Sequence, residues 1–196
     1  MKASAIVLAA GKSSRMGSNK LLLPFFGKTV LETTLDALRG IETVVVTGHR
    51  PEEFEEVLSG YSVEVVHNPR HEEGMTTSFQ AGLRSVDVDA VFLALGDQVG
   101  LDRRMLSAMV QVLVEDEDAV IVSPRYGDRR GHPVLFRRNL FYEILSLKPG
   151  ETLKDVVTRY EDGHRYVEGD VWTVIDMDTP EEYEAAKKLW SLTGRG

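Results

Sequence analysis

The chain contains no cysteine, which excludes disulfide bonds and thiolate metal sites. It has no apolar run of the roughly 18 or more residues that a membrane span requires, and its N-terminus lacks a signal-peptide pattern. Lys and Arg (23) are outnumbered by Asp and Glu (31), giving a net charge of −8, which argues against a nucleic-acid partner. We therefore expect a cytoplasmic protein, without membrane contact, that binds any anionic ligand through a local cluster of cations.

The chain is long enough for one well-packed domain. It has 196 residues, and the sequence shows neither an internal repeat nor a low-complexity segment that would break it. From residue 124 the regular rhythm gives way to polar, turn-rich sequence. We expect a single domain over 1–196, in which about 124–170 forms a lobe over the ligand crevice.

Apolar runs alternate with segments of helical spacing. The helical segments include one opened by the capping-box pattern of Thr29 and Glu32 and a last one opened by Thr179, Pro180 and Glu182. This alternation predicts an α/β fold, a doubly wound, mainly parallel Rossmann-like sheet whose ligand crevice lies at the carboxyl ends of the strands. Strands are expected over residues 6–10, 43–48, 63–67, 90–95, 119–122, 134–136 and 172–178.

The first strand leads into a loop suited to phosphate. Gly11 and Gly17 allow tight turns that expose backbone N–H groups, and Lys12, Arg15 and Lys20 add positive charge. The alternative is a basic surface loop without a ligand. The cluster of glycines and cations directly after a buried strand favours a phosphate cradle.

Two common phosphate-binding motifs do not fit this loop. A Walker loop would need glycine at Ile6, and a dinucleotide fingerprint would need glycine at Ser13 and Met16. The predicted phosphate cradle therefore follows neither of these two patterns.

Carboxylates follow two of the predicted strands. Asp97 comes after the most apolar run, where it could hold Mg²⁺ or cap a turn. Asp176 and Asp178 alternate on the predicted strand 172–178 and would project to one side. Asp178 could equally favour the N-terminus of the following helix.

The pattern Leu-Ala-Ala-Gly-x-Ser-x-Arg-Met-Gly-x-x-Lys, from Leu8 to Lys20, resembles the signature of nucleotidyltransferases that join an NTP to a small phosphorylated acceptor. The similarity is greatest to the molybdenum cofactor cytidylyltransferases and extends to about Glu182. Gly96-Asp97-Gln98 matches the family's metal motif, with Val99 in place of the usual proline. In the molybdenum cofactor branch, the segment matching Gly131-His132-Pro133-Val134 contacts the pterin acceptor.

The resemblance implies a function and a set of site residues. The function is Mg²⁺-dependent transfer of CMP from CTP to the phosphate of molybdopterin or molybdenum cofactor, with release of pyrophosphate. The implied catalytic residues are Arg15, Lys20 and Asp97; the metal ligands are Asp97 and Asp176; the acceptor residues are Gly131, His132 and Pro133; and the nucleotide-binding residues are Leu8, Ala9, Ala10, Gly11, Lys12, Ser13, Arg15, Lys20, Gly74, Met75 and Ser78.

Several alternatives stay open at this point. The acceptor could be a sugar or polyol phosphate, the nucleotide could be GTP, or the chain could be a non-catalytic protein that delivers the cofactor to a molybdoenzyme or its chaperone. Met75 could be a core residue, and His132 a structural or solvated one. The remaining histidines show no metal-ligand spacing.

Overall fold

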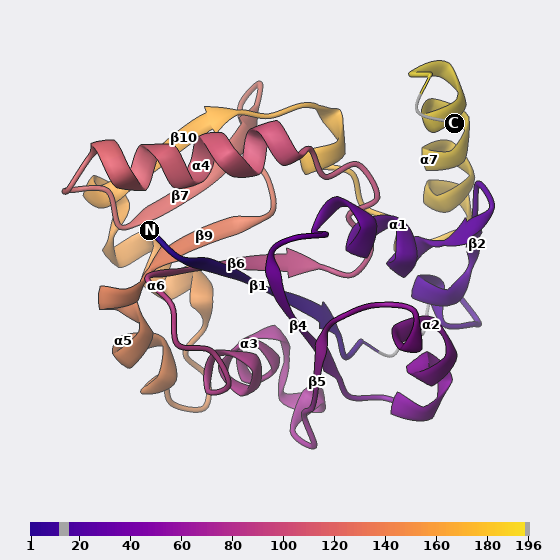
Figure 1. The fold of residues 1–196 in the computed structure, drawn as a ribbon, viewed down its shortest axis with the longest axis horizontal. Helices are drawn as coiled ribbons and strands as arrows, with labels where there is room; N and C mark the ends of the chain where they lie inside the picture. The colour runs from indigo at the N-terminus through magenta and orange to yellow at the C-terminus, as the bar shows by residue number, and fades with distance from the viewer. Residues whose placement is uncertain (12–15, 195–196) are drawn as a thin grey trace.

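The protein is built on one mixed sheet, shown in a computed structural model that describes residues 1–11 and 16–194 (Figure 1). The strands lie in the order β10-β7-β9-β6-β1-β4-β5, with β8 paired to β7 and a separate hairpin made by β2 and β3. Their bounds are β1 Ala3–Ala9, β2 Pro24–Phe25, β3 Lys28–Thr29, β4 Glu42–Thr47, β5 Glu64–His67, β6 Ala90–Leu95, β7 Ile121–Tyr126, β8 Arg129–Arg130, β9 Val134–Arg137 and β10 His164–Glu168.

Helices connect the strands. The α-helices are α1 Val30–Ala37, α2 Glu55–Ser59, α3 Met75–Leu83, α4 Arg103–Glu115, α5 Phe141–Leu145, α6 Leu153–Arg159 and α7 Pro180–Leu192. Short 3₁₀ turns are η1 Lys20–Leu22, η2 Pro51–Phe54, η3 His71–Glu73, η4 Arg138–Leu140, η5 Glu161–Gly163 and η6 Val171–Thr173. Among the described residues, no helix combines the length and apolarity that crossing a membrane would require.

The sheet is mostly parallel and covered on both faces, which confirms the predicted fold class. β1 pairs in parallel with β4 and β6, and β4 with β5. One core cluster packs α1, α2 and α4 on one face, and a second packs α3, α5 and α6 on the other. Coverage on both faces explains why these strands are continuous apolar runs: Ala5, Ile6 and Val7 of β1 have no exposed surface.

The segment 124–170 contributes strands to this same sheet. β9 runs antiparallel between β6 and β7, and β10 pairs in parallel with β7 at the edge. The β7–β8 hairpin extends the sheet further. The strand expected over 134–136 therefore exists. β10 was missed because it has only two consecutive apolar residues, Tyr166 and Val167.

The strand predicted over 172–178 is wrong. All seven of these residues are described, and they form the end of η6 followed by coil. Asp170 starts this turn by accepting the N–H of Trp172 at 2.9 Å, and the Thr173 hydroxyl donates to the Asp170 carbonyl at 2.7 Å. The apolar side chains that suggested a strand instead fill the core beneath α7: Trp172 is 4 % exposed.

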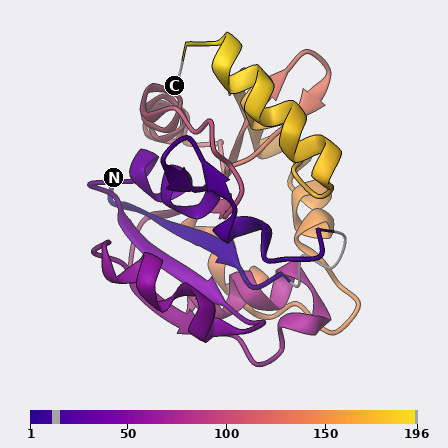
Figure 2. The same ribbon diagram turned by 90° about the vertical axis from the view of Figure 1, so that its right-hand side faces the viewer.

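Helix α7 is the last helix of the chain and packs against residues from the first part of the sequence. Figure 2 shows it alongside the segment that carries η1 and β2. Its Trp190 ring contacts Phe25 and Trp172 edge to face, at centroid distances of 5.1 and 5.2 Å. The Tyr183 hydroxyl donates to the Pro24 carbonyl. The predicted capping box of Thr179 and Glu182 is present and opens the helix. These contacts hold α7 against the segment that follows Lys20.

Candidate active site

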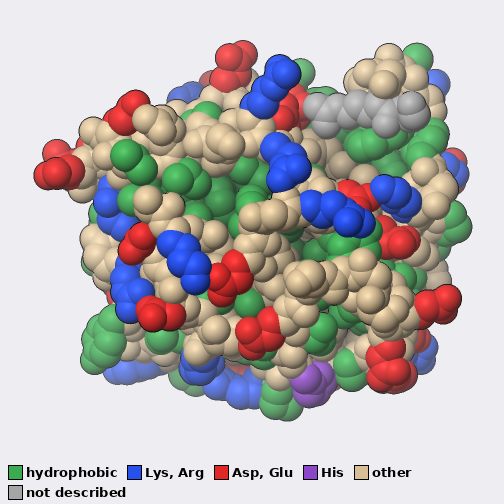
Figure 3. Space-filling view, in the orientation of Figure 1, with side chains coloured by type: hydrophobic (Ala, Val, Ile, Leu, Met, Phe, Trp, Pro, Cys, Tyr) green, Lys and Arg blue, Asp and Glu red, His purple; other side chains and the backbone are tan. Residues whose placement is uncertain are grey.

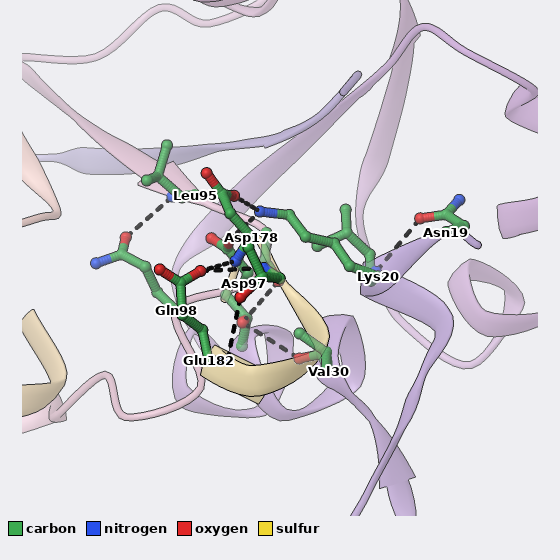
Figure 4. A network of polar contacts seen from close by, with 12 residues as sticks. Asn19, Lys20, Val30, Leu95, Asp97, Gln98, Asp178 and Glu182 are labelled. Atoms are coloured by element: carbon green, nitrogen blue, oxygen red, sulfur yellow. Dashed lines mark hydrogen bonds and ion pairs between the residues drawn. The ribbon is translucent and has the colours of Figure 1, made fainter. Parts of the chain in front are cut away.

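Three charged side chains from distant parts of the sequence meet at the carboxyl end of the central strand. The ammonium of Lys20 donates to Asp97 Oδ2 at 2.5 Å and to Asp178 Oδ1 at 2.6 Å (Figure 4). Lys20 lies in η1, Asp97 directly after β6, and Asp178 just before α7. The side chains of Lys20 and Asp97 are only 20 and 15 % exposed, so the charges interact through a partly desolvated medium.

The turn that carries Asp97 is fixed by neighbouring elements. The N–H of Gly96 donates to the Leu8 carbonyl at 3.0 Å, and the buried Thr34 hydroxyl of α1 donates to the Gly96 carbonyl at 2.9 Å. Gln98 folds back and accepts the N–H of Leu95 at 2.9 Å. A Cβ at Gly96 would lie 2.9 Å from a Leu21 methyl and 3.0 Å from the Leu8 carbonyl oxygen, so a larger residue would crowd this turn. The carboxylate thus projects from a rigid turn.

Electrostatics keep the lysine charged. Burial disfavours the ammonium, but the charges and hydrogen bonds of Asp97 and Asp178 outweigh burial and raise the pKa of Lys20. The residue is therefore a cation at neutral pH and balances one of the two carboxylates.

The paired carboxylates suit a hard divalent cation, whose ligands are oxygens. In this structure the Lys20 ammonium lies between them as a positive charge. No group of three or more His, Asp or Glu arranged to hold a metal exists among residues 1–11 and 16–194. This donor set fits a metal that keeps water and phosphate ligands, as Mg²⁺ does in nucleotide sites, and does not fit an all-protein cage.

Of the two carboxylates before α7, Asp178 and not Asp176 contacts the Lys20 ammonium. The expectation that both carboxylates project to one side rested on a strand that does not form. The Asp176 side chain is 71 % exposed and lies 4.0 Å from Arg129. Asp178, directly before the α7 N-cap, reaches Lys20 instead. The partner of Asp97 that the structure supports is therefore Asp178.

The segments expected to bind nucleotide border the same edge of the sheet. A Cβ at Gly48, after β4, would lie 2.9 Å from the Ala10 methyl and 2.5 Å from the His71 Cβ. These three residues are therefore packed tightly together. Leu8 and Ala9 end β1 here, and Gly11 follows.

The N-terminus of α3 also lies at this edge of the sheet. Gly74 has a left-handed φ of 107° at its N-cap. Met75 is 46 % exposed, which excludes the alternative of a core residue. Ser78 is buried and accepts a hydrogen bond from the Asn68 amide at 3.0 Å. Lys12, Ser13 and Arg15 lie outside the described residues.

The residues expected to bind the acceptor are held against η6. The N–H of His132 donates to the Thr173 carbonyl at 2.9 Å, and a Cβ at Gly131 would lie 2.3 Å from that carbonyl oxygen. Burial lowers the pKa of His132, opposed by a hydrogen bond to the Leu93 backbone and by the charges of Asp97 and Asp176. Its buried Nδ1 has no hydrogen-bond partner among the described residues. Pro133 is buried.

The charge distribution over the face in Figure 3 is mixed. Lys and Arg side chains lie among Asp and Glu side chains there. This agrees with the acidic composition and provides no track for a nucleic-acid backbone on this face.

The fold and the family match together show that the protein is a nucleotidyltransferase. The family model described as the MobA-like NTP transferase domain matches residues 5–187, and the chain belongs to this family.

Three relatives match nearly the whole chain. It is 28 % identical to the molybdenum cofactor cytidylyltransferase of Escherichia coli (strain K12), over 95 % of this chain and 96 % of that protein. Among solved structures, it resembles a nucleotidyl transferase from Methanothermobacter thermautotroptrophicus (Mth528), with a TM-score of 0.83, 29 % identity and coverage of 98 and 99 %. It also resembles a manganese complex of Rv0371c from Mycobacterium tuberculosis H37Rv, with a TM-score of 0.78, 27 % identity and coverage of 96 and 99 %.

Proposed function

We propose that the protein transfers CMP from CTP to the phosphate of molybdopterin or molybdenum cofactor, in a Mg²⁺-dependent reaction that releases pyrophosphate. The observation that carries this proposal is the Lys20 ammonium between Asp97 and Asp178 at the end of the central strand. The relative named as a molybdenum cofactor cytidylyltransferase matches nearly the whole length of the chain and supports the choice of nucleotide and acceptor.

The chemistry needs little from the protein beyond position and charge. A phosphate monoester has a second pKa of about 6, so an acceptor of this kind is largely a dianion at neutral pH. One acceptor oxygen attacks the α-phosphorus of CTP and forms a new P–O bond. The bond between that phosphorus and the oxygen bridging to the β-phosphate breaks, and pyrophosphate leaves with the electron pair. No general base is required.

In this proposal Lys20 and Arg15 neutralise charge that develops on the phosphates, together with the backbone N–H groups of the loop from Gly11. Asp97 and Asp178 would hold Mg²⁺. When bound, the ion supplies charge neutralisation and orientation of the triphosphate. The rigid turn at Gly96 keeps the Asp97 carboxylate fixed, which lowers the cost of organising the site.

The acceptor residues are proposed at the other side of the carboxylates. Gly131, His132 and Pro133 border the site through His132, whose ring is influenced by the charges of Asp97 and Asp176. The half-buried imidazole donates to the Leu93 backbone, so in its neutral form Nδ1 can accept one hydrogen bond from a polar heterocycle. In this proposal the segment orients the pterin while the charged cluster binds phosphate.

A pyrophosphate-release assay tests the proposal. We expect release with CTP only when molybdopterin or molybdenum cofactor and Mg²⁺ are both present, and little with ATP, UTP or GTP. A thermal-shift series with each NTP and Mg²⁺ gives an independent measurement, because preferential binding to the folded state raises stability. Equal release with a sugar or polyol phosphate would refute the acceptor, and tight CTP binding without turnover would favour a delivery protein.

A further inference from the structure

Asp178 is held in place by an unusual hydrogen bond. It lies in coil between η6 and α7, so no strand ladder fixes its backbone. Its N–H donates to Glu182 Oε2 at 2.8 Å, and the N–H of Thr179 donates to the same oxygen at 3.0 Å (Figure 4). One carboxylate oxygen on the first turn of α7 therefore anchors two successive backbone amides.

The other capping boxes of the chain show that this second bond is not part of ordinary capping. In α1, Glu32 accepts the N–H of Thr29, which is the N-cap. In α6, Asp155 accepts the N–H and the hydroxyl of the N-cap Thr152. Among the described residues, the box of α7 is the one whose acid also accepts the amide of the residue before the N-cap.

We propose that Glu182 is a positioning residue for the Asp178 carboxylate, an inference that rests on the proposed metal role of Asp97 and Asp178. Because the Asp178 amide is bonded to Glu182, its Cα is fixed relative to α7. The side chain then reaches the Lys20 ammonium at 2.6 Å.

The rest of α7 supports this arrangement. Tyr183 and Trp190 tie the helix to Pro24 and Phe25, a few residues after Lys20. Glu182 thus links the backbone of Asp178 to α7, a helix that packs near Lys20. This link holds the Asp178 carboxylate next to the Lys20 ammonium. Its negative charge at the start of the helix is favourable with respect to the helix dipole and offsets its proximity to Asp178.

The inference predicts a specific effect of substitution. Glu182→Ala frees the amide of Asp178, so the carboxylate samples more positions and binds a divalent cation more weakly. Glu182→Gln retains a side-chain oxygen that can accept both N–H groups and should recover most of the affinity. We expect Glu182→Ala to weaken binding by about tenfold, in the range seen when groups that orient metal ligands are removed.

The experiment measures Mn²⁺ binding to the whole protein by electron paramagnetic resonance, with CTP present and acceptor absent, so that turnover is not the readout. Asp97→Asn serves as the reference for loss of the metal site. Asp155→Ala is the matched control, because it removes the acid of a capping box at α6, on the other side of the molecule from α7 (Figure 1).

The expected result is weaker Mn²⁺ binding in Glu182→Ala, recovery in Glu182→Gln and no change in Asp155→Ala. Normal Mn²⁺ affinity in Glu182→Ala, while Asp97→Asn loses binding, overturns the role of Glu182 alone. An equal loss of Mn²⁺ affinity in Asp155→Ala also overturns the role of Glu182, because the loss of any helix cap would then explain the weaker binding. Normal binding in Asp97→Asn would instead overturn the metal site itself.

Discussion

Replacing Lys20 with methionine removes the charge that separates two carboxylates. Both Asp97 Oδ2 and Asp178 Oδ1 contact the same nitrogen, at 2.5 and 2.6 Å, so these oxygens are at most about 5 Å apart. At an effective dielectric constant of about 20, two unit charges at that distance repel by about 3 kcal/mol. Asp178 is 37 % exposed, and solvent screening reduces the expected cost to about 1–2 kcal/mol.

The sign of the pH effect follows from this repulsion. The repulsion exists only while both carboxylates are ionised. The free energy of unfolding of Lys20→Met should therefore fall furthest below that of wild type near neutral pH, and this deficit should shrink on acidification.

Urea unfolding with and without Mg²⁺, in the absence of nucleotide, tests this reasoning. We expect Mg²⁺ to stabilise Lys20→Met more than wild type, because the ion no longer competes with the ammonium and binds only the folded state. Lys28→Met is the control, since Lys28 pairs with the single carboxylate of Asp36. If Lys20→Met showed neither the pH dependence nor the Mg²⁺ effect, the two carboxylates would not form a cation site.

Three further changes probe the rest of the site and the fold. Asp97→Asn should retain the fold and lose most Mg²⁺-dependent transfer, because the near-isosteric amide lacks the charge; near-normal kcat would contradict its assignment as a metal ligand. His132→Ala should raise KM for the acceptor and leave CTP affinity nearly unchanged, whereas equal loss of CTP binding would place His132 at the nucleotide. Burial, and secondarily the charge of Arg130, lowers the pKa of His164 from about 6.5 in the unfolded chain to about 4 in the folded protein. Below about pH 6.5 the unfolded state therefore binds more protons than the folded state. Acidification from about pH 7 to pH 5 should therefore cost about 2 kcal/mol of unfolding free energy, measured by urea titration, and His164→Gln should flatten this slope while exposed His67→Gln does not.

The sequence predicts the parallel half of the sheet well because burial on both faces leaves long apolar runs. β1, β4 and β6 are of this kind. The position of β9 could not be predicted, since a four-residue apolar strand fits an edge hairpin as readily as an antiparallel place between β6 and β7. β10 lies at an edge and has only two apolar residues, Tyr166 and Val167, so it gives an equally weak signal.

The site was predictable where local signals exist. Lys20 belongs to the cationic loop, and Asp97 directly follows the most apolar strand. Asp176 was preferred to Asp178 as the partner of Asp97 because the family resemblance favours that position, and the strand predicted over residues 172–178 placed both carboxylates on one side. Two local signals opposed that strand: Asp170 two residues before Trp172, which caps a turn, and the capping box that begins directly after Asp178. The added bond from Glu182 to the Asp178 amide depends on three-dimensional geometry and has no sequence pattern of its own.

The choice of base is the remaining question, and Ala10 offers a way to test it. In the resembling families the end of the first strand lies beside the base, with alanine at this position in the cytidylyl branch and glycine in the guanylyl branch. The Ala10 methyl lies 2.9 Å from the place of a Cβ on Gly48, against which His71 also packs. Replacing Ala10 with glycine should leave more space at the end of the first strand and let the backbone there adopt other conformations.

We therefore expect wild type to prefer CTP over GTP, and Ala10→Gly to narrow that preference without reversing it. One methyl group contributes about 1–3 kcal/mol to discrimination, and other residues must share the selectivity. The measurement is kcat/KM for both nucleotides in both proteins. Ala9→Gly is the control, because it removes a methyl one residue earlier that faces the core on the α1 side. An equal reduction of the CTP preference in Ala9→Gly would show that backbone flexibility, and not the Ala10 methyl, causes the effect. A wild-type preference for GTP would refute the cytidylyl assignment and leave the nucleotidyltransferase class intact, since that class rests on the fold and the family match.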